Sequence, residues 1–283
     1  MRIKHLGNQL AKRLRRLPKT PHLAGAAILA GGMMFAGVAQ ADTLLSEDFN
    51  GLTLGPFVSS TESGGDGTDW TDVPPTGWAR DNGATPVGGP AEFFGFTFMD
   101  VTAWVATEAN QDRASFTKGS GAVMVADADA YDDDAGNGNV LGEASQSFNV
   151  FMTTSPIDLT GIAAGTAALN FDSSFRPYEA LTGLVDVSFD GGANFSNLLT
   201  LNAANSGGDS SLTRANESLS LPIDNPTGGS MLIRFGMATA DNDWWWAVDN
   251  VEVTGNPVPE PSSIALAGLA AAGLTVAGLR RRK

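Results

Sequence analysis

The chain has 283 residues and a formal net charge of −14 at pH 7, with no cysteine and only two histidines. The lack of cysteine excludes disulfides, a thiol nucleophile and cysteine-ligated zinc. Both histidines, His5 and His22, lie in the first 22 residues, so the rest of the chain offers no imidazole base and no serine–histidine–aspartate triad.

The negative charge is concentrated in the middle of the chain. All but one of the 31 acidic residues (Glu260 is the exception) lie between residues 42 and 255, but only six of the 17 basic residues do. This part therefore carries a charge near −24, which repels nucleic acid and other polyanions. It suits divalent cations or solubility outside the cell.

Residues 1–41 have the pattern of a secretory signal peptide. The first 22 residues hold seven Lys or Arg and no acid, residues 23–38 are apolar, and Ala39 and Ala41 form a small-x-small cleavage site before Asp42. The alternative is a permanent membrane anchor, for which the apolar run is short. We expect an exported protein whose mature domain spans residues 42–254.

Short apolar runs between turn-forming residues dominate the mature domain, and helical periodicity is nearly absent. This pattern is typical of an all-β, antiparallel jelly-roll β-sandwich. Residues 59–92 are rich in Gly, Pro and Asp and predict long loops over Trp70 and Trp78. The predicted strands are 44–49, 121–126, 148–153, 167–172, 184–190, 198–201, 231–237 and 244–253.

The alternation of side chains orients several of these strands. Met231, Ile233, Phe235 and Met237 share one face, which we expect to point inward. Val185, Val187 and Phe189 likewise share a face, and the turn 190–192 after them predicts a hairpin to residues 198–201.

The last strand breaks its own alternation. Trp246 and Val248 have one parity, and Val251 and Val253 have the other. A strand with one buried face needs an extra residue to keep both pairs inward, so we predict a β-bulge at Asp249-Asn250.

Segments 46–51, 189–192 and 246–251 resemble the concanavalin-like and MAM-like jelly-roll domains of secreted bacterial proteins. Segments 125–133, 171–177 and 242–250 resemble a module that accompanies calcineurin-like phosphoesterases. The phosphoesterase itself is not expected, because its metal motifs need histidine.

Two acidic clusters are candidate Ca²⁺ sites, since Ca²⁺ prefers six to eight oxygen ligands. The first contains Asp127, Asp129 and Asp132 in an acidic stretch that continues to residue 139; the alternative is a solvated loop. The second joins Glu47 and Asp48 to Asp249. The resemblance supports it, because jelly-roll domains often hold calcium where the first and last strands meet. The alternative has Asp249 capping the bulge.

The run of three tryptophans before the bulge offers Trp244 and Trp245 as a stacking surface for sugars. Alternate strand residues face opposite ways, so the three rings cannot share one surface, and core packing is the alternative. We expect Trp246 to be buried, and exposure of Trp245 would favour ligand binding. Arg176, one of few cations, is expected to form a structural ion pair.

The C-terminus has three parts: a linker 255–261 with Pro259, Glu260 and Pro261, an uncharged apolar run 262–279, and the basic tail 280–283. As a helix the apolar run would be about 27 Å long, enough for a marginal transmembrane helix. This order of features resembles the PEP-CTERM sorting signal recognised by exosortase systems of Gram-negative bacteria. The resemblance implies transient inner-membrane insertion and then sorting to the cell surface or extracellular matrix. A simple C-terminal anchor is the alternative.

Taken together, these features predict an exported, exosortase-sorted protein with a non-catalytic, calcium-binding and carbohydrate-binding β-sandwich, whose partner is exopolysaccharide. One alternative is a purely structural or adhesive matrix protein. Another is a carboxylate-based glycosidase, which would need two carboxylates about 5 Å or about 6.5–9.5 Å apart in one cleft.

Overall fold

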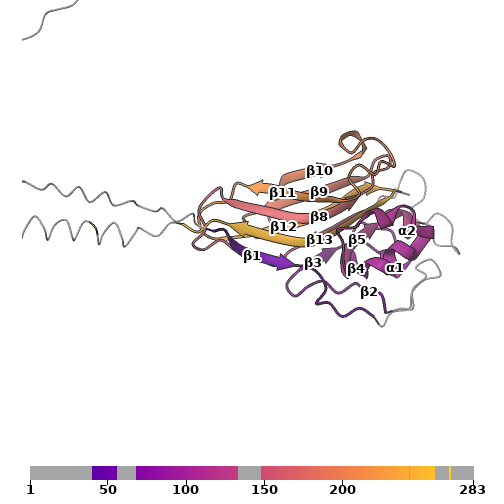
Figure 1. The fold of residues 1–283 in the computed structure, drawn as a ribbon, viewed down its shortest axis with the longest axis horizontal. Coiled ribbons are helices and arrows are strands. Elements are labelled where there is room, and N and C mark those ends of the chain that lie inside the picture. Colours follow the sequence, from indigo (N-terminus) through magenta and orange to yellow (C-terminus); the bar gives the residue numbers. More distant parts are fainter. Residues whose placement is uncertain (1–39, 56–67, 133–147, 242, 259–267, 269–283) are drawn as a thin grey trace, which may run out of the picture. The chain divides into compact units, whose positions relative to one another are not determined.

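The computed structural model describes residues 40–55, 68–132, 148–241, 243–258 and 268. Within these residues the chain forms two antiparallel sheets that pack face to face (Figure 1). The predicted all-β antiparallel sandwich is therefore confirmed.

The seven-stranded sheet is built around β13 (Trp245–Gly255), the last of the described strands. Its described strands run in the order β11 (Glu217–Ile223), β8 (Ala167–Phe175), β13, β5 (Ala122–Asp127), β4 (Thr97–Asp100) and β2 (Trp70–Thr71), and β1 (Asp42–Glu47) also pairs with β13. Thus β13 pairs with three strands: β8 along one side, β5 at its start and β1 at its end on the other.

The second sheet has six strands in the described part of the chain. They run in the order β10 (Ser196–Leu201), β9 (Thr182–Ser188), β12 (Ser230–Ala240), β6 (Phe148–Thr153) and β3 (Ala79–Asp81), with β7 (Ile157–Asp158) on the end of β12. The predicted hairpin between β9 and β10 is present. Phe189 differs from the prediction: it lies past the end of β9 in the turn and is 38% exposed.

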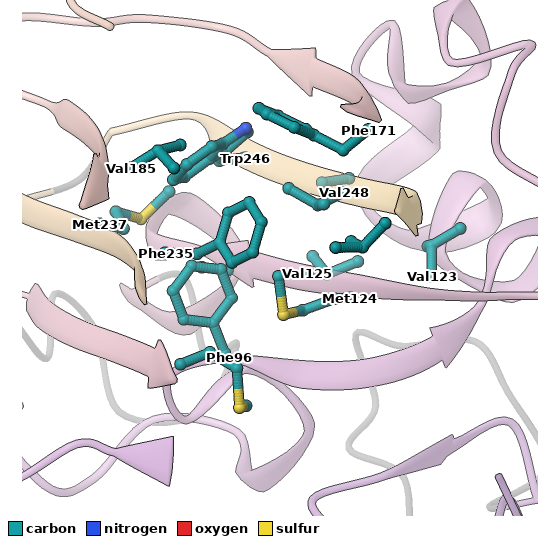
Figure 2. Close-up of a cluster of buried hydrophobic side chains, with 14 of the residues drawn as sticks. Phe96, Val123, Met124, Val125, Phe171, Val185, Phe235, Met237, Trp246 and Val248 are labelled. Carbon is teal, nitrogen blue, oxygen red and sulfur yellow. The ribbon is translucent and has the colours of Figure 1, made fainter. Parts of the chain in front are cut away.

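Large apolar side chains from both sheets fill the space between them, as Figure 2 shows for Trp246, Phe235 and Phe96. The Trp246 ring lies 5.9 Å from that of Phe235 on β12 and 6.3 Å from that of Phe96. Met231, Ile233, Phe235 and Met237 are buried as predicted, because a period of two places all four on the inner face of β12.

The predicted bulge in β13 is also present. Pairing with β8 shifts by one residue between Asp249 and Glu252, and Asn250 adopts φ 52°. The shift keeps Trp246, Val248, Val251 and Val253 all buried. It leaves Asp249 buried and Asn250 exposed.

The helical segments inside the sandwich domain were not predicted. They are α1 (Val101–Ala106), α2 (Ala128–Asp132) and the 3₁₀ turns η1 (Ala91–Phe93), η2 (Thr107–Asn110), η3 (Arg113–Ser115) and η4 (Ala203–Asn205). Trp104 of α1 packs edge-on against Trp245, with ring centres 5.8 Å apart. Because this segment covers the outer side of β13, Trp245, Ala247 and Asp249 are buried as well, and the first half of the strand has two buried faces.

Candidate functional site

The tryptophan run divides between the two faces of β13. Trp246 points into the core, and its Nε1 donates to Ser173 Oγ (3.0 Å). Trp245 points the opposite way but is also fully buried, with Nε1 donating to Ser174 Oγ (3.2 Å). The expectation that Trp245 could stack on a ligand is therefore wrong, because α1 and its following turns cover the ring.

A buried ion pair holds this cover in place. Arg113 Nη2 lies 2.8 Å from Asp127 Oδ2, and both side chains are fully buried. The guanidinium lies between Trp104 and Trp245, 5.8 Å and 5.6 Å from their ring centres. Removing one partner of such a pair is strongly destabilising, because the other charge is left buried.

The sequence suggested that Asp127 belongs to an open acidic loop, but the structure places it elsewhere. It ends β5, accepts from Trp104 Nε1 (2.9 Å) and from Ala130 N (3.0 Å), and caps α2. Asp129 and Asp132 lie on α2 and are buried. The rest of that predicted calcium loop, residues 133–139, lies outside the described residues.

Trp244 is the one tryptophan of the run that is only partly buried. The guanidinium of Arg176 lies 3.9 Å from its ring centre, and Trp244 Nε1 donates to Ser210 Oγ (2.9 Å). Tyr178, 36% exposed, approaches it edge-on at 6.4 Å. Arg176 also forms the predicted ion pair, with Asp112 at 3.5 Å. We call Trp244 and Tyr178 the Trp244 surface; the Trp244 ring is held in place by Arg176 and Ser210, as a stacking surface requires.

Asp243, next to this surface, is a buried carboxylate whose Oδ2 accepts from Asp241 N (2.9 Å). The pKa of Asp243 is raised to about 7, mainly by burial and partly by the negative charges of Glu179, Asp241 and Asp209, against the lowering effect of the Asp241 hydrogen bond. Low dielectric and like charges both disfavour the ionised form. This group therefore changes charge near neutral pH.

Asp249, at the bulge, is the second buried carboxylate with a raised pKa. The pKa of Asp249 is raised to about 6, mainly by burial and partly by the charges of Asp172 and Asp48. Hydrogen bonds from the backbone N–H groups of Ser120 (3.0 Å) and Asn250 (2.7 Å) act in the lowering direction.

The other predicted calcium ligands near the bulge make local backbone contacts. Glu47 Oε1 accepts from Phe49 N (2.8 Å), and Asp48 Oδ1 accepts from Asn50 N (3.0 Å). In the part of the chain that the structure describes, no three acidic side chains are grouped closely enough to hold a metal ion. Calcium binding stays a prediction.

A pocket of about 250 Å³ lies at the open edge of the sandwich, where β2 ends one sheet and β3 ends the other. Its walls are mainly apolar and aromatic, with one ion pair. The lining residues are Trp70, Asp72, Arg80, Val87, Gly88, Gly89, Ala91, Phe94 and Tyr131. We call this the edge pocket.

Hydrogen bonds fix the polar wall and the rim of the edge pocket. Arg80 Nη2 donates to Asp72 Oδ2 (2.8 Å) and Nη1 donates to Phe96 O (3.4 Å), so the guanidinium is oriented from two sides. Asn82 Nδ2 donates to Phe94 O (2.7 Å), and the hydroxyl of Tyr131 donates to the carbonyl of Pro86. The pocket is thus formed without a ligand.

Gly89 is required where the rim meets the aromatic wall. A Cβ there would lie 2.6 Å from the ring of Tyr131 and 2.2 Å from its carbonyl oxygen. This pocket was not predicted, because its lining residues come from separate segments, most of them in the region 59–92 that the sequence predicts as loops. The buried Trp70 and the Gly88-Gly89-Pro90 run were the available signals.

The C-terminal segment matches a known sorting signal. Residues 257–283 fit the family described as PEP-CTERM protein-sorting motif. The chain carries a PEP-CTERM motif. It is therefore an exported, surface-sorted protein, as the sequence predicted.

The two ends of the chain otherwise lie largely outside the described residues. Those undescribed parts include Ala39, the tripeptide Pro259, Glu260 and Pro261, and all but residue 268 of the apolar run 262–279. Ala41 is exposed just before β1. None of the helices in the described ranges has the length and apolar character needed to cross a membrane.

Several solved structures are similar in outline. The K1 cleaved adhesin domain of Lys-gingipain from Porphyromonas gingivalis W83 is 16% identical, with a TM-score of 0.42, over 70% of this chain and 98% of that one. A cyclase from Fischerella sp. TAU is 11% identical, with a TM-score of 0.42 (77% and 99% coverage). TmCBM61, solved with β-1,4-galactotriose, is 12% identical, with a TM-score of 0.36 (63% and 88%). No curated protein matches the chain.

Proposed function

We propose that this exported, surface-sorted protein is a non-catalytic sugar-binding protein, and that the edge pocket holds one neutral sugar ring of a polysaccharide. The observation that carries this proposal is the combination of a preformed pocket of about 250 Å³, aromatic walls and a single oriented ion pair. Small-ligand sites are typically concave and mostly apolar, with a few fixed polar groups.

The chemistry of the walls favours a neutral sugar. The apolar face of a pyranose packs against aromatic rings such as Phe94, and its hydroxyls donate to Asp72 and accept from Arg80. The ion pair leaves the wall without net charge, so an anionic or cationic ligand gains little there. Asp72 is the one acidic residue of the lining, whereas a glycosidase needs two carboxylates in the same cleft.

The test is calorimetric titration of the domain with neutral trisaccharides of glucose, galactose, mannose and xylose. We expect one of them to bind, and Phe94→Ala or Arg80→Met to weaken binding at least about tenfold, as loss of a buried stacking or charged contact does. Val73→Ala is the matched control, because Val73 is exposed (60%) and does not line the pocket. Unchanged affinity in both pocket variants, or no binding of any trisaccharide, would overturn the proposal.

The Trp244 surface is the second candidate for the same function. Its support is the half-buried ring held by Arg176 beside the exposed Tyr178. A Trp244→Ala variant belongs in the same titration. Loss of binding in this variant alone would place the sugar at the Trp244 surface and remove it from the edge pocket.

We also propose that Ca²⁺ binds near Asp249, Asp172 and Asp48 by drawing these side chains closer together than they lie in the structure, where no three acidic side chains of the described residues are close enough to hold an ion. Its support is electrostatic: each of the other two charges raises the pKa of the buried Asp249 carboxylate, and a cation would offset that repulsion. A higher melting temperature in Ca²⁺ than in EDTA is the expected result. Equal melting temperatures in Ca²⁺ and in EDTA would refute the proposed calcium binding.

A further inference from the structure

The chain just before the sorting tripeptide is bound to the body of the domain. Val258 N donates to Gly161 O (2.7 Å), Ala163 N donates to Asn256 O (2.8 Å), and Ile162 and Pro257 form an isolated antiparallel bridge. We call residues 255–258 and 161–166 together the C-terminal clasp.

The clasp is packed rather than loosely laid on the surface. Ile162 is buried against Gly255, where a Cβ would come within 2.7 Å of Ile162 Cγ2. Asn225, also buried, accepts at Oδ1 from the N–H groups of Thr166 and Ala167 (both 2.9 Å). Its Nδ2 donates to Ala163 O (3.2 Å). These bonds fix the turn to which the C-terminal segment is attached.

The sorting motif begins inside this clasp, because its match starts at residue 257. Val258 is still hydrogen-bonded to the domain, and the tripeptide starts at the next residue. An extended chain gains only about 3.5 Å per residue, so Glu260 can lie no more than about 7 Å from Val258. A sorting enzyme that reaches the tripeptide must therefore touch this end of the sandwich.

We propose that this end of the sandwich is a docking surface for the membrane-bound sorting enzyme. The exposed charged residues near the clasp are acidic, namely Asp42, Asp158 and Asp224, and the apolar Val258 beside them is 47% exposed. Asp42 pairs with Gly255, and Asp224 lies beside Gly165. A surface of this charge fits a basic protein surface with an apolar centre and is repelled by anionic lipid headgroups.

The proposal rests on the sorting motif and is independent of sugar binding. The test follows the full-length protein in its own cells, with the mass of the C-terminus and the surface-associated fraction as readouts. The charge reversal Asp158→Lys/Asp224→Lys is expected to slow processing at least about fivefold, since rim charges mainly set association rates. Asp209→Lys, an exposed acid outside the clasp, is the matched control and should be processed normally.

A spacer separates docking from simple steric hindrance. Ten Gly/Ser residues inserted between Val258 and Pro259 move the tripeptide away from the surface, so we expect slower processing. The same spacer after Gly191, in the exposed β9–β10 turn, is the control. Normal or faster processing with the clasp spacer, or normal processing of the charge reversal, would overturn the proposal. A chain ending at Val258 tests sorting itself. If its location is unchanged, both the sorting role of the motif and the docking proposal are refuted. Failed sugar binding alone would not affect the docking proposal.

Discussion

Asp243 makes the domain sensitive to pH in the direction opposite to most surface carboxylates. Its pKa is about 7 in the folded protein against an ordinary value of 3.8, so the folded state holds this proton more tightly than the unfolded state. The stabilisation of the folded state by this bound proton is fully present below about pH 4 and is lost as the pH rises through 7. Three pKa units correspond to about 4 kcal/mol, and more than half of this develops between pH 5 and pH 8.

The Asp243→Asn substitution removes the charge and keeps a side-chain oxygen to accept from Asp241 N. The variant should therefore gain about 2–3 kcal/mol more over wild type at pH 8 than at pH 5. For a domain of this size that is a difference of about 5–10 °C in melting temperature.

Thermal denaturation followed by near-UV circular dichroism, at pH 5, 6, 7 and 8 in EDTA, measures this difference. Asp209→Asn is the control, because Asp209 is exposed and acts on Asp243 only through its charge. It should shift the melting temperature much less. A variant whose advantage over wild type is the same at pH 5 and pH 8 would refute the reasoning, because the ionisation of a buried carboxylate cannot be independent of pH.

Two further predictions concern charged groups elsewhere in the fold. Arg113→Met should destabilise the domain by about 3–5 kcal/mol in urea denaturation, because Asp127 is left as a buried charge without its counter-ion. The double variant Arg113→Met/Asp127→Asn should recover part of this loss. Additive losses of stability from the two substitutions would contradict the reasoning. Ca²⁺ at about 100 times its Kd should stabilise the wild type by about 2.7 kcal/mol and Asp249→Asn by much less, measured as the shift in melting temperature between Ca²⁺ and EDTA. An equal shift in both proteins would place the ion elsewhere.

The strands were predictable where one face is buried and the other is wet. β6 occupies residues 148–153 as predicted, with Phe148, Val150 and Met152 buried and the residues between them partly exposed. The bulge at Asp249-Asn250 was predictable for the same reason, since a strand that changes parity can keep its apolar side chains on one buried face only by gaining a residue.

The helical cover and the edge pocket were not predictable from local patterns. α1 has six residues and α2 has five, which is too short to establish a period of 3.6. The burial of Trp245 depends on Trp104 and Arg113, more than 130 residues earlier in the chain. The residues of the tryptophan run alone therefore do not predict that Trp245 is buried.

The pairing of β1 with β13 also determines when, during synthesis of the chain, the seven-stranded sheet can be completed. Among the described strands β13 is the last to be synthesised, yet β1, β5 and β8 all hydrogen-bond to it. A chain that stops before Trp245 has a sheet without its centre, and its first strand has no neighbour in that sheet. Because the sorting motif begins two residues after Gly255, a chain long enough to be sorted is also one that has received its central strand. The motif thus marks only chains that already contain β13, and a chain that stops before Trp245 lacks both the motif and the central strand of this sheet.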